Sequence, residues 1–272
     1  MKVAAVQFAP EFMDAKQNTQ TTIEVLHRLA AEGVDLAVFP EAFLTGYCFA
    51  NKDEAISAAI STDGGEFELL ANVCSEDGIN VVIGFAEKSG GHLHNSAAVI
   101  TPSGIAGVYR KTHLPFLGLD RFAEPGDSLP MFDIGGAKVA VGICYDVRVP
   151  ELSRCYALSG ADIICIPTNW PESAEKSSDI MCPARAIENH VFIVAADRVG
   201  EERGYRFVGR SKIIDPLGNV LASADHDEEA IVIAEIDPAT ARDKNIVKRA
   251  GEYELPIFES RNPALYSRIT DK

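Results

Sequence analysis

Apolar residues gather in short, nearly unbroken runs along the chain. The clearest runs are KVAAVQF, DLAVFP, NVVIGFAE, KVAVGIC, DIICIP and VFIVAAD, all rich in β-branched or small residues. A strand with one exposed face would alternate apolar and polar residues, whereas continuous apolar character indicates a strand that is covered on both faces. The pattern therefore predicts buried sheet strands with helices lying over them.

Two segments between these runs, 17–32 and 150–159, carry apolar residues at helical spacing instead. The apolar positions are Ile23, Leu26 and Ala30 in the first segment and Leu152, Cys155 and Leu158 in the second. Pro150 suits the first turn of a helix, where a missing N–H has no partner to lose. Gly33 and Gly160 then stand where helices commonly end. We expect two amphipathic helices here.

The two halves of the chain resemble each other. The matching segments are KVAAVQ at 2–7 with KVAVGI at 138–143, 33–43 with 160–170, 79–87 with 190–198, and 95–111 with 209–224. The TPSG and DPLG sequences inside the last pair are typical of tight hairpin turns. The repeat predicts an α/β protein in which two similar sheets pack face to face: a four-layer αββα sandwich with an internal pseudo-twofold repeat.

No low-complexity linker divides the halves, and a chain of 272 residues with 47% hydrophobic content can bury one large core. We therefore expect a single domain over residues 1–272. The tail from about residue 241 is polar and contains Pro256 and Pro263. This composition predicts a C-terminal arm over about 241–272 that is extended on the surface or on a neighbouring subunit.

Charge and cysteine content restrict the partners and the compartment. The formal net charge of −15 repels phosphate backbones and anionic lipids, so we expect no nucleic-acid partner and no membrane partner. No run approaches the roughly 20 apolar residues of a membrane span. Gln7 and Pro10 interrupt the first run too early for a signal peptide. The six cysteines form no CxxC pair and several lie in apolar runs, which predicts a cytoplasmic protein without a disulfide framework.

Three reactive side chains follow three predicted strands. Glu41 follows DLAVFP, Lys111 ends GIAGVYRK, and Cys144 ends KVAVGIC. Taken singly, each has an ordinary interpretation: a charge at a helix N-terminus, an exposed hairpin cation and a small buried hydrophobe. Together, a carboxylate, an ammonium group and a thiol at neighbouring strand ends provide a base, an oxyanion stabiliser and a nucleophile, which is the equipment of acyl transfer.

The sequences around these residues resemble a known family. FPE around Glu41, YRKTHLP around Lys111 and GICYDVRVPE around Cys144 are similar to motifs of the nitrilase superfamily of carbon-nitrogen hydrolases. The likeness extends to NWP at 169–171 and to 184–222, and so covers nearly the whole chain. The resemblance implies an αββα fold, a Glu-Lys-Cys triad that needs no cofactor or metal, a small-molecule amide substrate, and a homodimer or higher homo-oligomer.

The resemblance also implies a role for each residue. Glu41 takes the thiol proton and passes it to the leaving amine, while Cys144 attacks the carbonyl. Lys111 and the backbone N–H of Tyr145 stabilise the oxyanion. Many family members have a second Glu after the lysine, and Asp120 stands at that place here. An ordinary loop acid beside Arg121 is the alternative for Asp120, and Glu124 is a less suitable substitute.

Further residues are expected to line or support the site. The repeat places Asn169 and Trp170 in the same cleft as Glu41, as a wall of the acyl pocket, although core packing is equally open for Trp170. Tyr47 and Phe43 could also wall the pocket. A second set is expected to act in support: Asp146, Arg148 and Glu151 as a paired network around the nucleophile, and His113 as its neighbour. His92 and His94 lack a third ligand and predict a solvated turn rather than a metal site.

The residues after the nucleophile bear on the substrate. Nitrile-hydrolysing members resemble one another in a Trp and Glu where this chain has Tyr145 and Asp146, so an amide is favoured. Val147 replaces one of two arginines typical of enzymes that cleave N-carbamoyl amino acids. The leading hypothesis is hydrolysis of a small linear amide, an ω-amide or an N-carbamoyl amine, through a Cys thioester with release of ammonia. Nitrilase activity, acyl transfer, and a binding protein that has lost turnover are the alternatives.

Overall fold

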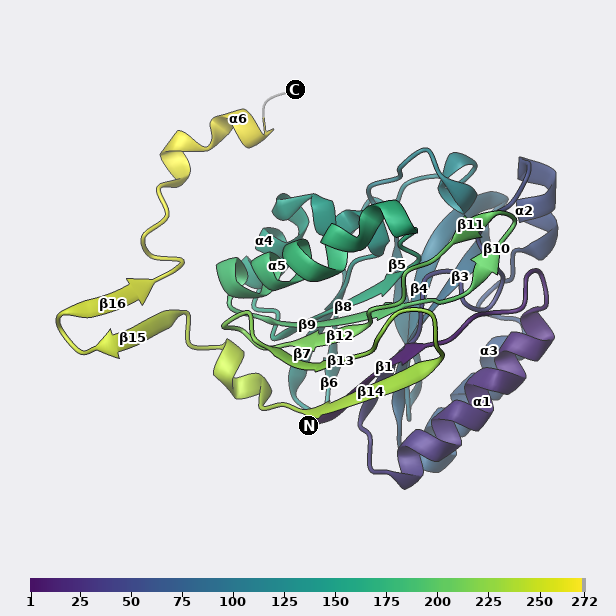
Figure 1. Cartoon of the computed structure of the whole chain (residues 1–272), viewed down its shortest axis with the longest axis horizontal. Coiled ribbons are helices and arrows are strands. Elements are labelled where there is room, and N and C mark those ends of the chain that lie inside the picture. Colours follow the sequence, from purple (N-terminus) through teal and green to yellow (C-terminus); the bar gives the residue numbers. More distant parts are fainter. Residues whose placement is uncertain (271–272) are drawn as a thin grey trace.

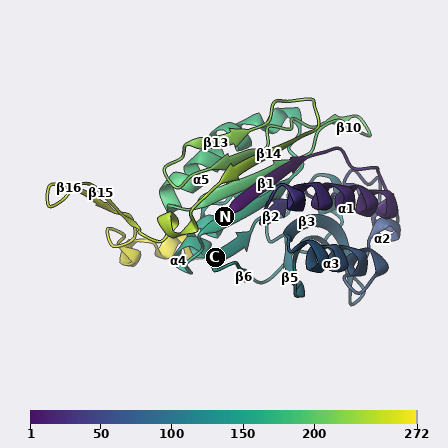
Figure 2. The same cartoon turned by 90° about the horizontal axis from the view of Figure 1, so that it is seen from below.

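The computed structural model describes residues 1–270 and contains two six-stranded sheets packed face to face. Helices α1 (Ala15–Ala31) and α3 (Gly65–Asp77) lie along the outer face of the first sheet, while α4 (Pro150–Leu158) and α5 (Cys182–Asn189) cover the second (Figures 1 and 2). The predicted four-layer αββα sandwich is confirmed. The short helix α2 (Lys52–Ala58) belongs to the loop that follows the second strand.

The first sheet has the strand order β14-β1-β2-β3-β4-β5. Its strands are β1 Lys2–Gln7, β2 Leu36–Val38, β3 Asn80–Ser89, β4 His92–Thr101, β5 Gly104–Arg110 and β14 Ala230–Glu235. Strands β1, β2 and β3 are parallel, and the others pair antiparallel at the two edges. The carboxyl ends of the parallel strands therefore meet at one edge of the sheet, where α/β proteins commonly bind ligands.

The second sheet repeats this arrangement in the order β13-β12-β9-β8-β7-β6. Its strands are β6 Met131–Ile134, β7 Ala137–Val141, β8 Ile163–Thr168, β9 Phe192–Asp197, β12 Lys212–Ile214 and β13 Val220–Ser223. Strands β7, β8 and β9 are parallel and correspond one by one to β1, β2 and β3. The internal repeat inferred from the sequence is thus a repeat of sheet topology.

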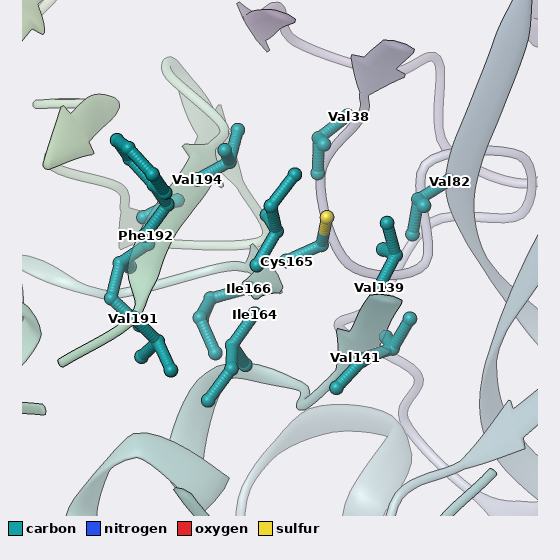
Figure 3. Close-up of a cluster of buried hydrophobic side chains, with 14 of the residues drawn as sticks. Val38, Val82, Val139, Val141, Ile164, Cys165, Ile166, Val191, Phe192 and Val194 are labelled. Atoms are coloured by element: carbon teal, nitrogen blue, oxygen red, sulfur yellow. The ribbon is translucent and has the colours of Figure 1, made fainter. Parts of the chain in front are cut away.

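Apolar side chains from both sheets form one shared core. Figure 3 shows Val38 and Val82 of the first sheet opposite Val139 and Cys165 of the second. The outer face of the first sheet packs in a separate cluster against α1 and α3, with Leu26 at its centre. Both faces of each central strand are therefore covered, which explains why the strand sequences show no polar alternation.

The two predicted helices form, but their buried faces differ from the prediction. In α1, Leu26 is buried as expected, whereas Ile23 and Ala30 lie at the edge of the buried stripe. In α4 the prediction was wrong: Cys155 is exposed and Leu158 is 44% exposed. The buried residues of α4 are Leu152, Ser153, Tyr156 and Ala157. The Tyr156 hydroxyl donates to the carbonyl of Val141 at 2.8 Å, and this contact fixes the rotation of the helix.

The outer side of α4 faces the C-terminal segment. A hairpin of β15 (Asn245–Arg249) and β16 (Tyr253–Pro256) projects away from the sheets, and α6 (Ser267–Thr270) follows it (Figure 1). A cavity of about 450 Å³ lies between this segment and α4, and Cys155 and Leu158 line it. The last two residues of the arm predicted over 241–272 lie outside the described residues.

The described residues, 1–270, include all six cysteines of the chain. All six cysteines are free thiols, and only Cys155 is exposed. Among residues 1–270, no helix combines the length and apolarity needed to cross a membrane.

Gly84 of β3 provides a test of how the fold positions Glu41. A Cβ at Gly84 would lie 2.5 Å from the carbonyl oxygen of Pro40 and 2.7 Å from Cα of Glu41, so the backbone must move to admit it. We expect Gly84→Ala to lower the free energy of unfolding by about 1–3 kcal/mol, as overpacking does, and to displace Glu41. Urea unfolding measures this change. Gly65→Ala is the control, because a Cβ at Gly65 meets no atom within 4 Å; equal losses in both variants would contradict the prediction.

Candidate active site

Three strand ends bring Glu41, Lys111 and Cys144 together. Glu41 lies just beyond β2, Lys111 directly follows β5, and Cys144 lies just beyond β7 of the second sheet. Nζ of Lys111 donates to Oε1 of Glu41 at 2.7 Å. Besides burial, the charges of Glu41 and Lys111 both act on the pKa of the Cys144 thiol. The structure therefore brings Glu41 and Lys111 into direct contact at two of the predicted strand ends.

Lys111 is completely buried and binds two carboxylates. Its ammonium group donates to Glu41 and, at 2.6 Å, to Oδ2 of Asp120. Burial alone would lower the pKa of Lys111, but the charges of Asp120 and Glu41 outweigh burial and raise it. The ammonium group therefore stays protonated, with a fixed position between the two acids.

Asp120 lies in a short 3-10 helix over Gly118–Arg121 and is 4% exposed. Its Oδ2 also accepts the Tyr47 hydroxyl at 2.9 Å. Arg121, the neighbour considered as an alternative partner, instead places its guanidinium over the rings of Phe116 and Phe122. Asp120 therefore binds Lys111, as one of the two sequence interpretations expected, although its side chain is one methylene shorter than glutamate.

Asn95 is a member of this cluster that the sequence interpretation missed. Its amide nitrogen donates to Oε1 of Glu41 and to Oδ1 of Asp120, both at 2.7 Å. The backbone N–H of Lys111 donates to the carbonyl of Asn95 at 2.8 Å, so the sheet places the two side by side. The sequence feature that could have indicated this role is the amide side chain of Asn95 at the start of the apolar run NSAAVI. One donor group shared by two carboxylates holds them at a fixed separation.

The second oxygen of Glu41 is free for chemistry. Oε2 of Glu41 is buried and has no hydrogen-bond partner among residues 1–270. Burial raises the pKa of Glu41, and Asp120 adds to the rise, although Lys111 and Asn95 oppose it. A carboxylate with one anchored oxygen, one free oxygen and increased basicity is suited to accept a proton from a neighbouring group.

Cys144 lies at a sharp bend between β7 and the following 3-10 helix. Its φ of 47° falls in the left-handed region that non-glycine residues rarely adopt. Asp146 stabilises the bend, because its Oδ2 accepts the backbone N–H of Ile143 at 2.8 Å and the Tyr109 hydroxyl at 2.7 Å. Nδ1 of His113 donates to the other oxygen at 2.7 Å. Such local strain is commonly found at functional sites.

The predicted network around the bend is correct for Asp146 and His113 but wrong for two residues. Arg148 and Glu151 are both exposed, and neither makes a hydrogen bond or ion pair within residues 1–270. The expectation that these charges are paired rested on their being buried, and the turn after Cys144 directs them outward instead.

The thiol of Cys144 is held in its neutral form. Burial raises its pKa well above the ordinary range, and the charge of Glu41 raises it further. Lys111, the hydroxyl of Thr168 and the backbone N–H of Asn169 act in the opposite direction without reversing the shift. A buried cluster of two acids and one ammonium group has a net negative charge, which disfavours a thiolate. The proton of the thiol therefore leaves only when an acceptor takes it.

A cavity of about 230 Å³ opens above Cys144. Tyr47, Tyr145, Arg148 and Trp170 are among the residues that line it. Trp170 is 2% exposed and also belongs to the shared core, so it both lines the cavity and packs in the core. The volume is that of a small-molecule site.

Two expected pocket residues have other positions. The amide of Asn169 donates to the carbonyl of Glu41 at 2.9 Å and so ties the two halves together behind the pocket. Phe43 packs against Phe39 in the core between the first sheet and its helices. The direction of a side chain in a loop depends on backbone dihedrals that a motif does not encode, so the motifs identified Tyr47 and Trp170 as wall residues but misplaced Asn169 and Phe43.

The hairpin histidines contact one acidic residue. Nδ1 of His92 lies 2.8 Å from Oε2 of Glu124, and Nδ1 of His94 lies 2.9 Å from the carbonyl of Glu124. Glu124 thus contacts the hairpin histidines, whereas Asp120 binds Lys111, which agrees with the expectation that Glu124 is the less suitable fourth acid.

The comparisons with known proteins agree with this fold and these motifs. The family model described as carbon-nitrogen hydrolase matches residues 2–245, and the chain belongs to that family. A nitrilase of Pyrococcus abyssi is 41% identical over 248 residues, which cover 90% of this chain and 93% of that protein. The 2-oxoglutaramate amidase of Bacillus subtilis is 32% identical over 269 residues, which cover 97% and 98%.

Solved structures show the same fold. A variant of the amidase from Nesterenkonia sp. AN1 matches with a TM-score of 0.80 at 21% identity, over 98% of this chain and 96% of that one. That structure shows the acetamide moiety of fluoroacetamide added covalently at its active-site cysteine. The protein is thus an enzyme, a nitrilase-superfamily carbon-nitrogen hydrolase, as the three motifs predicted.

His113 provides a test of the bend around Cys144 through pH. The hydrogen bond with Asp146 raises the pKa of His113 above 6.5, although partial burial opposes it. Because the pKa of His113 is higher in the folded state, its charged pair with Asp146 stabilises the fold fully below about pH 6.5. This contribution to the free energy of unfolding is lost as the pH rises through the folded-state pKa. The side chain is 37% exposed, so screening limits this contribution to below about 1 kcal/mol.

We therefore expect the stability advantage of the wild type over His113→Gln to be greatest at about pH 5.5 and to shrink by about pH 9. Urea unfolding gives the free energy of unfolding of both proteins at the two pH values. Subtracting the value of the variant from that of the wild type at each pH removes the contribution of titrating groups that both proteins share. A constant difference between the two proteins would contradict the assignment of the charged pair.

Proposed function

We propose that the enzyme hydrolyses a small linear amide through a thioester on Cys144, with Glu41 as general base and acid and Lys111 as oxyanion stabiliser. The observation that carries this proposal is the arrangement of Lys111. Its buried ammonium group binds one oxygen of Glu41 and leaves the other oxygen free, beside a neutral thiol at a strained bend. The arrangement supplies a base, a positive charge and a nucleophile at one point.

The reaction then proceeds in two stages, formation of the thioester and its hydrolysis. The sulfur of Cys144 forms a bond to the amide carbon while the thiol proton moves to Glu41. Glu41 passes this proton to the departing nitrogen, the carbon–nitrogen bond breaks, and ammonia leaves with a thioester remaining. Water next attacks the thioester and gives one proton to Glu41, the carbon–sulfur bond breaks, and the proton returns to the sulfur. The raised pKa of Glu41 favours each uptake of a proton.

Two donors are available for the oxyanion. Lys111 contributes its ammonium group, and the backbone N–H of Tyr145 makes no backbone hydrogen bond within residues 1–270. A donor directed at the developing charge contributes about 3 kcal/mol to transition-state stabilisation in hydrolases. Asp120 and Asn95 keep Lys111 in place and do not need to touch the substrate.

Arg148 favours a substrate that carries a carboxylate. Arg148 lines the cavity above Cys144, is exposed, and has no acidic partner among residues 1–270. An unpaired guanidinium at the mouth of a small apolar cavity is suited to bind a carboxylate in a forked hydrogen bond. A monoamide of a short dicarboxylic acid, that is an ω-amide, would place its amide on Cys144 and its acid on Arg148. The related 2-oxoglutaramate amidase is named for a substrate of this kind.

Nitrile hydrolysis is the second candidate, because the Pyrococcus abyssi relative is named a nitrilase. A nitrile carbon could form a thioimidate with the same cysteine. Tyr145 and Asp146 stand where nitrile-hydrolysing members resemble one another in Trp and Glu, and this difference favours the amide. Homo-oligomer formation and a cytoplasmic location stay predictions from the sequence.

Cys144→Ala tests the nucleophile. We expect ammonia release from a panel of ω-amides to fall to the uncatalysed level, because no other group in the cavity can form the thioester. Thermal unfolding checks that the variant is folded, and removal of one small side chain should change the melting temperature by only a few degrees. Ammonia release retained by a folded variant would overturn the proposal, and a wild type inactive on amides but active on nitriles would favour the second candidate.

Arg148→Gln tests the carboxylate contact. We expect kcat/KM for a dicarboxylate monoamide to fall about 10-fold to 100-fold, mainly through KM, since a hydrogen bond to a charged group is worth about 1.5–3 kcal/mol. A neutral primary amide of equal length is the matched control substrate and should lose little. Equal losses for the two substrates would show that Arg148 does not select the acid.

A further inference from the structure

A buried glutamate from the second half of the chain binds the loop that follows Glu41. Glu202 belongs to the small hairpin of β10 (Glu201–Glu202) and β11 (Tyr205–Arg206) and is 5% exposed. Its Oε1 accepts two consecutive backbone N–H groups, those of Tyr47 at 2.9 Å and Cys48 at 2.6 Å. These two bonds fix the backbone of the loop at Tyr47.

The charge of Glu202 is compensated by Arg198, the residue after β9. Nη1 of Arg198 donates to Oε2 of Glu202 at 2.6 Å, and the guanidinium lies over the ring of Phe207 at 4.4 Å. Both side chains are almost completely buried. Burying an ion pair costs about as much desolvation energy as it returns, so such a pair is weak evidence for a purely stabilising role. Its consequence here is geometric, because it directs a carboxylate at one loop.

Tyr47 connects this pair to the candidate active site. Its hydroxyl donates to Oδ2 of Asp120 at 2.9 Å, the same oxygen that accepts Nζ of Lys111. The ring packs against Gly118, where a Cβ would lie 2.6 Å from Cδ1 of Tyr47, so the ring has little freedom to shift. Hydrogen bonds therefore connect Arg198 and Glu202 to the backbone of Tyr47, and the Tyr47 hydroxyl continues the connection through Asp120 to Lys111.

We propose that Glu202 is a positioning residue for the hydrolytic reaction, acting through Tyr47 and Asp120 on the ammonium group of Lys111; this inference rests on the proposed function. If the loop backbone shifts, the Tyr47 hydroxyl leaves Asp120, and Asp120 no longer holds Lys111 in place. The ammonium group then moves toward Glu41 and away from the oxyanion. Errors of about 1 Å in a catalytic group can reduce a rate about 100-fold.

The test is a double-mutant cycle on kcat with Glu202→Gln, Tyr47→Phe and the combination. The Gln side chain keeps the size of Glu202, but its amide N–H cannot accept from Arg198, so the ion pair that directs Glu202 at the loop is lost. We expect each single variant to lower kcat about 10-fold to 100-fold with little change in KM. The double variant should be no slower than the slower single variant, since Glu202 acts through the hydroxyl that Tyr47→Phe removes. Independent, multiplicative losses would overturn the inference.

Asp162→Asn is the matched control. Asp162 is also a buried carboxylate that accepts a backbone N–H, from Lys138, and pairs with an arginine, Arg242. It precedes β8 at the end of the strand opposite Asn169, away from the candidate site. We expect it to lose stability without the fall in kcat. An equal fall in kcat for Asp162→Asn would show that general destabilisation, not positioning, explains the effect.

Two further variants distinguish a folding defect, failure of the proposed function and failure of the positioning inference. Glu202→Asp keeps the buried charge but shortens the reach, should give an intermediate kcat, and replaces Glu202→Gln in the cycle if that variant does not fold. Cys144→Ala distinguishes the two proposals. If it stays active, the proposed function fails whatever Glu202 does, whereas an inactive Cys144→Ala together with an unchanged kcat for Glu202→Gln overturns only the positioning inference.

Discussion

One buried ammonium group shared by two buried carboxylates is the interaction on which the site depends. Lys111 would be too costly to bury alone, and so would Glu41 and Asp120, but together they leave a single uncompensated negative charge. Burial and the charge of Glu41 disfavour a thiolate at Cys144, while burial and the charge of Asp120 raise the pKa of Glu41 against the opposing effect of Lys111. The cluster thus explains the permanent charge of the lysine, and through Glu41 it adds to the effect of burial that keeps the thiol neutral.

The pseudo-twofold repeat places this cluster where the two halves meet. Glu41 and Lys111 come from the first sheet and Cys144 from the second, so neither half contains a complete site. Contacts across the junction hold the parts in register: Asn169 donates to the carbonyl of Glu41, and Glu202 accepts the N–H of Tyr47. The core shared by the sheets therefore supports the geometry of the site as well as the stability of the fold.

The periodicity of apolar residues was sufficient to predict the strands and helices, but not which side of every helix is buried. Continuous apolar runs identified the central strands because both of their faces are covered, and the repeat predicted two similar sheets packed face to face. The buried side of α4 was misjudged, since Leu158 at helical spacing is apolar but exposed, while the Tyr156 hydroxyl finds a partner inside. Arg148 was assigned to a buried network for a similar reason, although its side chain turns outward to the cavity.

The sequence by itself determined the αββα architecture, the family and the three residues with reactive groups, because strand periodicity and short motifs are local properties. Only the tertiary structure decided which groups complete the site. Asn95 bridges two acids through the register of β4 and β5, Asp120 reaches Lys111 through a loop, and Glu202 acts from about 155 positions further along the chain than Tyr47. Such contacts depend on dihedral angles and on packing between distant segments, and no local pattern encodes them.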